Sequence, residues 1–130
     1  MPGKRLLITL TAAAALLAAG PAFAHHGTAG YDMVKVVTIT GTVTKVDWSN
    51  PHVIFHIDSK AGGDIQHWSM EVSPPLLMSR FGWNKDSLKP GDQVIAETHP
   101  AKNGASVGIS GTASFLLKFV VNGSPLPHSP

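Results

Sequence analysis

Residues 37–44 alternate between threonine and residues that are apolar or small. Thr38, Thr40, Thr42 and Thr44 take every second position, and Val37, Ile39, Gly41 and Val43 fill the positions between them. A period of two places the two sets on opposite faces of a strand, and β-branched residues suit a pleated surface. The stretch therefore predicts a half-buried β-strand, and the rest of the fold is organised around it.

A turn and a second strand follow this first strand. Ser49-Asn50-Pro51 has turn chemistry, because Asn tolerates unusual dihedral angles while Pro fixes φ and lacks an N–H donor. The alternation resumes at His52, with His52, Ile54 and His56 on one face and Val53, Phe55 and Ile57 on the other. The predicted hairpin therefore has one apolar face and one face that carries two imidazoles.

The first 24 residues have the organisation of a secretory signal peptide. Lys4 and Arg5 precede an apolar run of 14 residues, and the segment ends in the small-x-small sequence Ala22-Phe23-Ala24. The run is shorter than the roughly 20 residues that a membrane-spanning helix needs. We therefore expect a cleaved leader and a periplasmic or secreted bacterial protein with no stable membrane span, rather than an uncleaved anchor.

Removing 24 of the 130 residues leaves 106, which suits one domain with a modest core. We expect a mobile N-terminal arm over residues 25–35, a β-barrel domain over 36–121 and a Pro-rich tail over 122–130. The chain has no cysteine, which excludes disulfides, a lipid-anchored Cys, Cys-based zinc sites and thiol catalysis. The domain must therefore be held together by its core.

The charge balance argues against a nucleic-acid partner. Lys4 and Arg5 leave with the leader, so eight of the ten basic residues remain against eight acidic ones. A formally neutral domain without a basic run lacks the electrostatic surface of a nucleic-acid binder. We therefore expect the partner to be a metal ion or a small ligand. The sequence does not indicate a protein partner.

Further strands are expected over residues 65–72, 93–98, 106–111 and 115–121. Between the first two of these, residues 73–82 predict a short helix with Ser73 as N-cap, Pro at the first helical positions and Gly82 as terminator. This order predicts a mostly β fold, a small five- or six-stranded antiparallel OB-like barrel with one short helix between strands three and four.

Two pairs of histidines are expected to meet in such a barrel. A loop centred near Ala61 puts His56 about opposite Gln66 or His67, although a shift of one residue puts the two histidines on opposite faces. In the OB-fold the loops after strands one and four flank the same binding face. His52, at the exit of the first loop, and His99, at the start of the second, are therefore expected to approach one another.

All seven histidines follow the leader, and two of them come directly after the predicted cleavage site. As the first residue, His25 offers its α-amine and a ring nitrogen to one metal ion, and a second histidine from the fold completes such a site. Imidazole suits copper, zinc and nickel, and copper stands highest in the affinity order. The candidate ligands are His25, His26, His52 and His99, with copper as first choice. The alternative is a solvated His-His end without a partner.

Several motifs spread over the mature chain also resemble one family. They are His25-His26, Tyr31-Asp32, Gly41-Thr42-Val43, Trp48-Ser49-Asn50-Pro51-His52, Gly82-Trp83 and Asp86-Ser87-Leu88-Lys89-Pro90-Gly91-Asp92. Together they are similar to the small exported bacterial proteins of domain-of-unknown-function family 6152. The resemblance implies export and a small β-barrel, and it implies no activity. The apolar stretch Phe115–Val121 departs from the polar closing strands usual in that family.

The motifs of enzymes with a protein nucleophile are missing, since the chain has no Gly-x-Ser-x-Gly elbow and no phosphate-binding glycine loop. We therefore expect a non-enzymatic, metal-binding protein of the cell envelope. Two alternatives remain, because an OB-like barrel serves many ligands. One is a binding module for a small molecule, glycan or partner protein without metal, and the other is a structural protein of the envelope.

Overall fold

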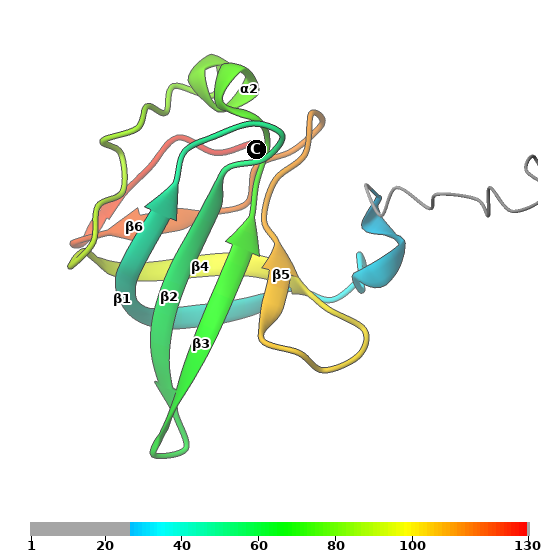
Figure 1. The fold of residues 1–130 in the computed structure, drawn as a ribbon, viewed down its shortest axis with the longest axis vertical. Coiled ribbons are helices and arrows are strands. Elements are labelled where there is room, and N and C mark those ends of the chain that lie inside the picture. Colours follow the sequence, from blue (N-terminus) through cyan, green and yellow to red (C-terminus); the bar gives the residue numbers. More distant parts are fainter. Residues whose placement is uncertain (1–26, 130) are drawn as a thin grey trace, which may run out of the picture.

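The computed structural model describes residues 27–129, whose strands form one sheet that closes into a barrel (Figure 1). In chain order the elements are η1 (Thr28–Gly30), β1 (Val37–Asp47), β2 (Ile54–Ala61), β3 (Asp64–Glu71), α2 (Pro75–Arg80), β4 (Gln93–Pro100), β5 (Val107–Ile109), β6 (Phe119–Val121) and β7 (Ser124–Pro125). The strand order is β1-β2-β3-β5-β4-β6-β7, and β1 also pairs with β4. That last pairing closes the ring of β1 to β5.

The first strand closes the barrel because it serves two partners. Its first half, Val37–Thr42, pairs with β4, and its second half, from Gly41 onward, pairs with β2. Gly41 lies where the two pairings overlap, and a Cβ there would overlap the backbone oxygen of Asp58. The alternation is as expected, with Ile39 and Val43 buried and the threonines on the outer face exposed or half-buried.

The predicted fold class is confirmed. Five strands make the barrel, and the helix α2 lies between β3 and β4 in the chain. Two details differ from the expectation. The pairing of β3 with β5 is parallel, whereas the others are antiparallel, and β6 and β7 extend the sheet beyond β4. The apolar closing stretch is explained by β6, because it delivers Phe119 and Val121 to the core.

The β2–β3 hairpin turns through Gly62 and Gly63, whose φ values of 67° and 98° are those of a two-residue turn. Ala61 is therefore a strand residue opposite Asp64, and the register pairs His56 with Ser69 and Asp58 with His67. The expected position of His56 opposite Gln66 or His67 is wrong, because the turn is shorter and lies further along the chain. His56 and His67 still lie on the same outer face, because His67 pairs with Asp58, which is two residues after His56 in β2.

The core is centred on three aromatic rings that come from different parts of the chain. Phe55, Trp83 and Phe119 are buried, with ring centroids 5.2–5.7 Å apart. The tilted and edge-on arrangements are those that aromatic rings prefer. Trp83 is 2% exposed. It follows α2, which covers one end of the barrel and buries Met78 (Figure 1).

The helix α2 begins later than expected. Its N-cap is Pro74 rather than Ser73, and no side chain caps it. The reason is the Pro74-Pro75 pair, because proline at the first helical position needs no partner for a missing N–H. Ser73 instead lies buried, and its carbonyl accepts from the backbone N–H of Val53 at 3.2 Å.

Both ends of the described chain are hydrogen-bonded to the barrel. In the segment expected to be a mobile arm, Tyr31 forms a bridge with Ala101, and the backbone N–H of Asp32 donates to Pro100. In the expected tail, β7 pairs with β6, and the carbonyl of Pro127 accepts from Nε1 of Trp83 at 2.6 Å. Within residues 27–129 no helix is long and apolar enough to cross a membrane.

Candidate functional site

Two of the four predicted metal ligands fall within the described chain. His25 and His26 lie outside it. His52 precedes β2 and lies next to the end of β3, and His99 lies near the end of β4. The strand expected to begin at His52 begins at Ile54. His52 stands at the exit of the turn after β1, as predicted, and its side chain is 31% exposed.

The ring of His52 is oriented by two oxygen atoms. Its Nδ1 lies 3.1 Å from the carbonyl oxygen of Val72 and 3.2 Å from Oε1 of Glu71. A carbonyl oxygen only accepts hydrogen bonds, so Nδ1 must carry the proton. In the neutral ring the lone pair is then on Nε2. A metal-binding histidine commonly has this arrangement, in which one ring nitrogen donates to a carbonyl or carboxylate and the other binds the metal.

Glu71 was not among the predicted site residues. The period of β3 places it on the polar face, but its contact with His52 depends on the register of β2 and β3 and on the path of the chain past Val72. Its charge reaches a third group as well. Burial, and then the negative charge of Glu71, raises the pKa of Tyr31 above its ordinary value of 10.0. Glu71 therefore lies between His52 and the segment that leads to the N-terminus.

These residues border a cavity of about 270 Å³. His52 and Glu71 line it together with Gly27, Thr28 and Ile109, and the first turn of α2 contributes Leu77. The residues that follow Gly27 are hydrogen-bonded, since Lys102 donates its backbone N–H to Gly30 and Tyr31 donates to Thr28. The cavity therefore joins the histidine at the first turn to the chain segment that directly follows His26.

His99 has a structural environment. It was expected to open a loop, but it lies within β4 and is only 8% exposed. Its Nδ1 donates to the carbonyl oxygen of Lys35 at 2.8 Å, and its ring packs edge-on against Phe115 with centroids 5.5 Å apart. The reason for the difference is that β4 continues to Pro100, where it pairs with β5.

His52 and His99 are expected to approach one another, but in the structure other residues lie between them. Glu71, Ile109 and His99 form one row across β3, β5 and β4. Neighbouring strands are about 4.8 Å apart, so the Cα atoms of Glu71 and His99 are separated by about 10 Å. Across residues 27–129, no three His, Asp or Glu side chains gather into a group that could hold a metal ion.

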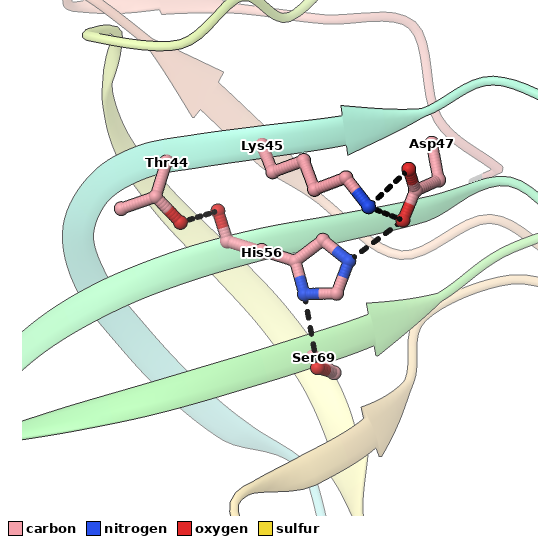
Figure 2. A network of polar contacts seen from close by, with 5 residues as sticks. All are labelled: Thr44, Lys45, Asp47, His56 and Ser69. Carbon is pink, nitrogen blue, oxygen red and sulfur yellow. Dashed lines mark hydrogen bonds and ion pairs between the residues drawn. The ribbon is translucent and has the colours of Figure 1, made fainter.

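A second polar cluster lies on the outer face of β1, β2 and β3, as Figure 2 shows. Nε2 of His56 donates to Oδ2 of Asp47 at 2.9 Å, and Lys45 contacts the same carboxylate at 2.8 Å. Hydrogen bonds from Lys45 and then from His56 hold the pKa of Asp47 below its ordinary value of 3.8. Nδ1 of His56 lies 3.2 Å from Oγ of Ser69, so both nitrogens of this ring are engaged.

Ser69, His56 and Asp47 have the connectivity of a serine-histidine-carboxylate triad, yet the strand geometry does not favour acyl transfer. Such a site needs N–H donors aimed at the developing oxyanion. The backbone N–H of Ser69 donates instead to the carbonyl of Ser106 at 3.1 Å. The side chains lie on one face of three paired strands, so we interpret the cluster as a link between these strands.

The remaining described histidines are also accounted for. Nδ1 of His67 contacts Oδ1 of Asp58 at 2.6 Å on the exposed face of the hairpin, where His67 is 77% exposed. Nδ1 of His128 contacts the carbonyl of Leu126 at 3.2 Å. Of the described histidines, His52 therefore combines a carboxylate neighbour, a fixed ring and a place in the cavity that adjoins the N-terminal segment.

Comparison with known proteins gives a family and no activity. No curated protein matches the chain. Residues 14–111 match the family described as "Family of unknown function (DUF6152)", and this range includes every strand from β1 to β5. Because the match covers most of the 130 residues, the chain belongs to this family of unknown function.

Proposed function

We propose that the chain is an exported cell-envelope protein that binds a metal ion, with copper as first choice, at the cavity between His52 and Gly27. The proposed ligands are the α-amine and ring of His25, the ring of His26 and Nε2 of His52. His99 is the alternate ligand, ranked last because its ring is enclosed. The protein acts by holding the ion, without a catalytic step.

One observation carries the proposal, namely that Gly27 and His52 line the same cavity. Gly27 directly follows His26 in the sequence, and consecutive Cα atoms are about 3.8 Å apart. His26 and His25 are one and two residues away from Gly27 along the chain, a span short enough to support their role as ligands at this cavity. Backbone contacts of Tyr31 with Ala101 and of Asp32 with Pro100 hold the start of the described chain against the end of β4.

The surroundings of His52 support the same proposal. The contacts of Nδ1 with Val72 and Glu71 orient the ring and support Nε2 as the ligand nitrogen, and the carboxylate of Glu71 adds negative charge next to the site. Partners of this kind typically change metal affinity about 10- to 100-fold when they are removed. Metal binding competes with protons for amine and imidazole lone pairs, so affinity should fall as the pH is lowered.

Calorimetric titration of the processed protein with copper tests the proposal. We expect one ion per chain with sub-micromolar affinity, and a large loss in His52→Ala and in a variant with one glycine added before His25. The matched control is His67→Ala, which removes a histidine from the distant hairpin face. Micromolar or weaker binding that is unchanged in His25→Ala and His52→Ala would overturn the proposal.

Export is tested separately, by mass spectrometry of the protein recovered from the periplasm or medium of a bacterial host. We expect an N-terminus at His25 and a mass that includes one copper ion when the protein is measured under native conditions. An N-terminus elsewhere would remove the α-amine of His25 from the ligand set. The calorimetric result for His52 would then decide whether a metal site remains.

A further inference from the structure

The barrel is open along one side of β3. The strand β5 has three residues and pairs only with Ser69–Glu71, the last three residues of β3. The first part of β3, Asp64–Trp68, pairs with β2 alone within the described chain. In Figure 1 the chain between β4 and β5 swings out in a wide loop at this level instead of continuing as a strand. The opening is a consequence of the length of β5.

A cleft of about 470 Å³ occupies this opening. Its apolar lining includes Val37 and Ile39 from β1 and the half-buried indole of Trp68 from β3. Ligand sites for small molecules commonly have volumes of about 300–1,000 Å³ and apolar walls. The cleft therefore has the size of a site for a small organic molecule, with one apolar wall and a polar rim.

The rim of the cleft carries a positive bias. Lys35 and Lys102 line it, both are exposed, and neither forms an ion pair with another residue of the described range 27–129. The acidic residue on the same rim is Asp32, whose Oδ1 already accepts the backbone N–H groups of Val34 and Lys35 at 3.2 Å. Two ammonium groups beside one engaged carboxylate favour a singly charged anion over a cation.

We propose that this cleft binds an amphipathic carboxylate, with its apolar chain against Trp68, Val37 and Ile39 and its carboxylate between Lys35 and Lys102. The inference goes beyond the proposed metal binding and does not depend on it. The cleft and the cavity at His52 share no lining residue, so each can be tested while the other is intact. The occupant is defined by this chemistry, an acyl chain that ends in one negative charge.

Octanoate is a suitable probe, and 1-octanol is its uncharged match. Binding to the full processed chain is followed by tryptophan fluorescence, with Trp68→Phe to identify the responding indole. We expect a saturable change with octanoate that Trp68→Phe abolishes. Octanol should bind about fivefold more weakly, because two exposed charge pairs contribute modestly. A response to octanoate that does not saturate, or that persists in Trp68→Phe, would overturn the proposal.

Three variants separate the parts of the proposed site. Lys35→Gln with Lys102→Gln should bring octanoate down to the affinity of octanol, whereas Lys85→Gln, an exposed lysine after α2, should leave it unchanged. Ala105→Leu places extra bulk in the cleft from its exposed loop and should abolish binding of both probes. If Lys85→Gln lost as much octanoate affinity as the double variant, binding would depend on the overall charge of the protein and not on this cleft. Unchanged binding in Ala105→Leu would place the ligand elsewhere.

Nuclear magnetic resonance gives a readout that does not depend on fluorescence. Octanoate should shift the indole N–H of Trp68 and the backbone amides of Lys35 and Lys102. Shifts centred on His52 and Thr28 instead would assign the probe to the metal cavity and overturn the proposal. Copper affinity, measured in the same Lys35→Gln and Lys102→Gln chain, should be unchanged, so that failure of one proposal is distinguishable from failure of the other.

Discussion

At the residue scale, the histidines have different roles because their rings contact different atoms. Nδ1 of both His52 and His99 donates to a backbone carbonyl, but His99 is enclosed by Phe115 and the arm, while His52 borders a cavity. His56 is held at both nitrogens. The count of histidines therefore says less about metal binding than the hydrogen bond at each ring does.

Tyr31 provides a test of the geometry around Glu71. It is the only tyrosine of the chain, so the absorbance of tyrosinate reports this residue alone. Burial and the charge of Glu71 raise its pKa above 10.0, and we expect Glu71→Gln to lower that pKa part of the way back, because burial remains. Glu97→Gln, which alters another half-buried glutamate, should leave the titration unchanged.

The same shift predicts how stability depends on pH. Since the folded state raises the pKa of Tyr31, its neutral form favours folding below pH 10.0, and this contribution is lost as the pH rises through the folded pKa. Urea unfolding of the wild type should therefore show a steeper loss of stability above about pH 10 than unfolding of Tyr31→Phe. If the stability of the wild type and of Tyr31→Phe fell equally with pH, the pKa of Tyr31 would not be raised in the folded state.

At the scale of elements, β1 depends on one glycine. Gly41→Ala would place a Cβ against the backbone oxygen of Asp58 and 2.8 Å from Cγ2 of Ile57. A backbone atom in a paired strand cannot move aside without breaking the pairing, so we expect a loss of about 3 kcal/mol in the free energy of unfolding. Urea denaturation measures it. Gly30→Ala is the matched control, because no atom lies within 4 Å of its Cβ position.

The elements themselves were largely predictable, because burial decides them. Val53, Phe55 and Ile57 are buried as their alternation predicts, and the position of α2 between β3 and β4 follows from its prolines and terminal glycine. The register of β2 and β3 was not predictable, since a loop centred on Ala61 and a turn through Gly62 and Gly63 fit the same composition. The contact of His52 with Glu71 depends on that register, which explains why Glu71 was missed.

At the scale of the whole molecule, the C-terminal segment holds the helix end of the barrel closed. Trp83 Nε1 donates to Pro127, Leu126 donates its N–H to Phe119, and Ser129 forms two hydrogen bonds with Leu116. The sequence alone suggested a Pro-rich tail, because prolines say little about where a segment docks.

Deleting residues 124–130 should lower the free energy of unfolding by about 3 kcal/mol, because the hydrogen bonds that this segment forms with Trp83, Phe119 and Leu116 are lost. A double-mutant cycle makes the cause specific. Trp83→Phe should cost less in the shortened chain than in the full chain, since the hydrogen bond to Pro127 is already gone. Equal costs in both chains, measured by urea denaturation, would show that the bond to Pro127 does not stabilise the fold.

The short length of β5 also has a kinetic consequence. Along Asp64–Trp68 the backbone N–H groups that point toward β2 are hydrogen-bonded, and those that point away face the open side of the barrel. Hydrogen exchange should therefore alternate along this stretch, with every second amide protected, and should slow at each residue from Ser69 onward, where a second neighbour begins. A carboxylate bound in the cleft should slow hydrogen exchange only at the amides that face the open side of the barrel.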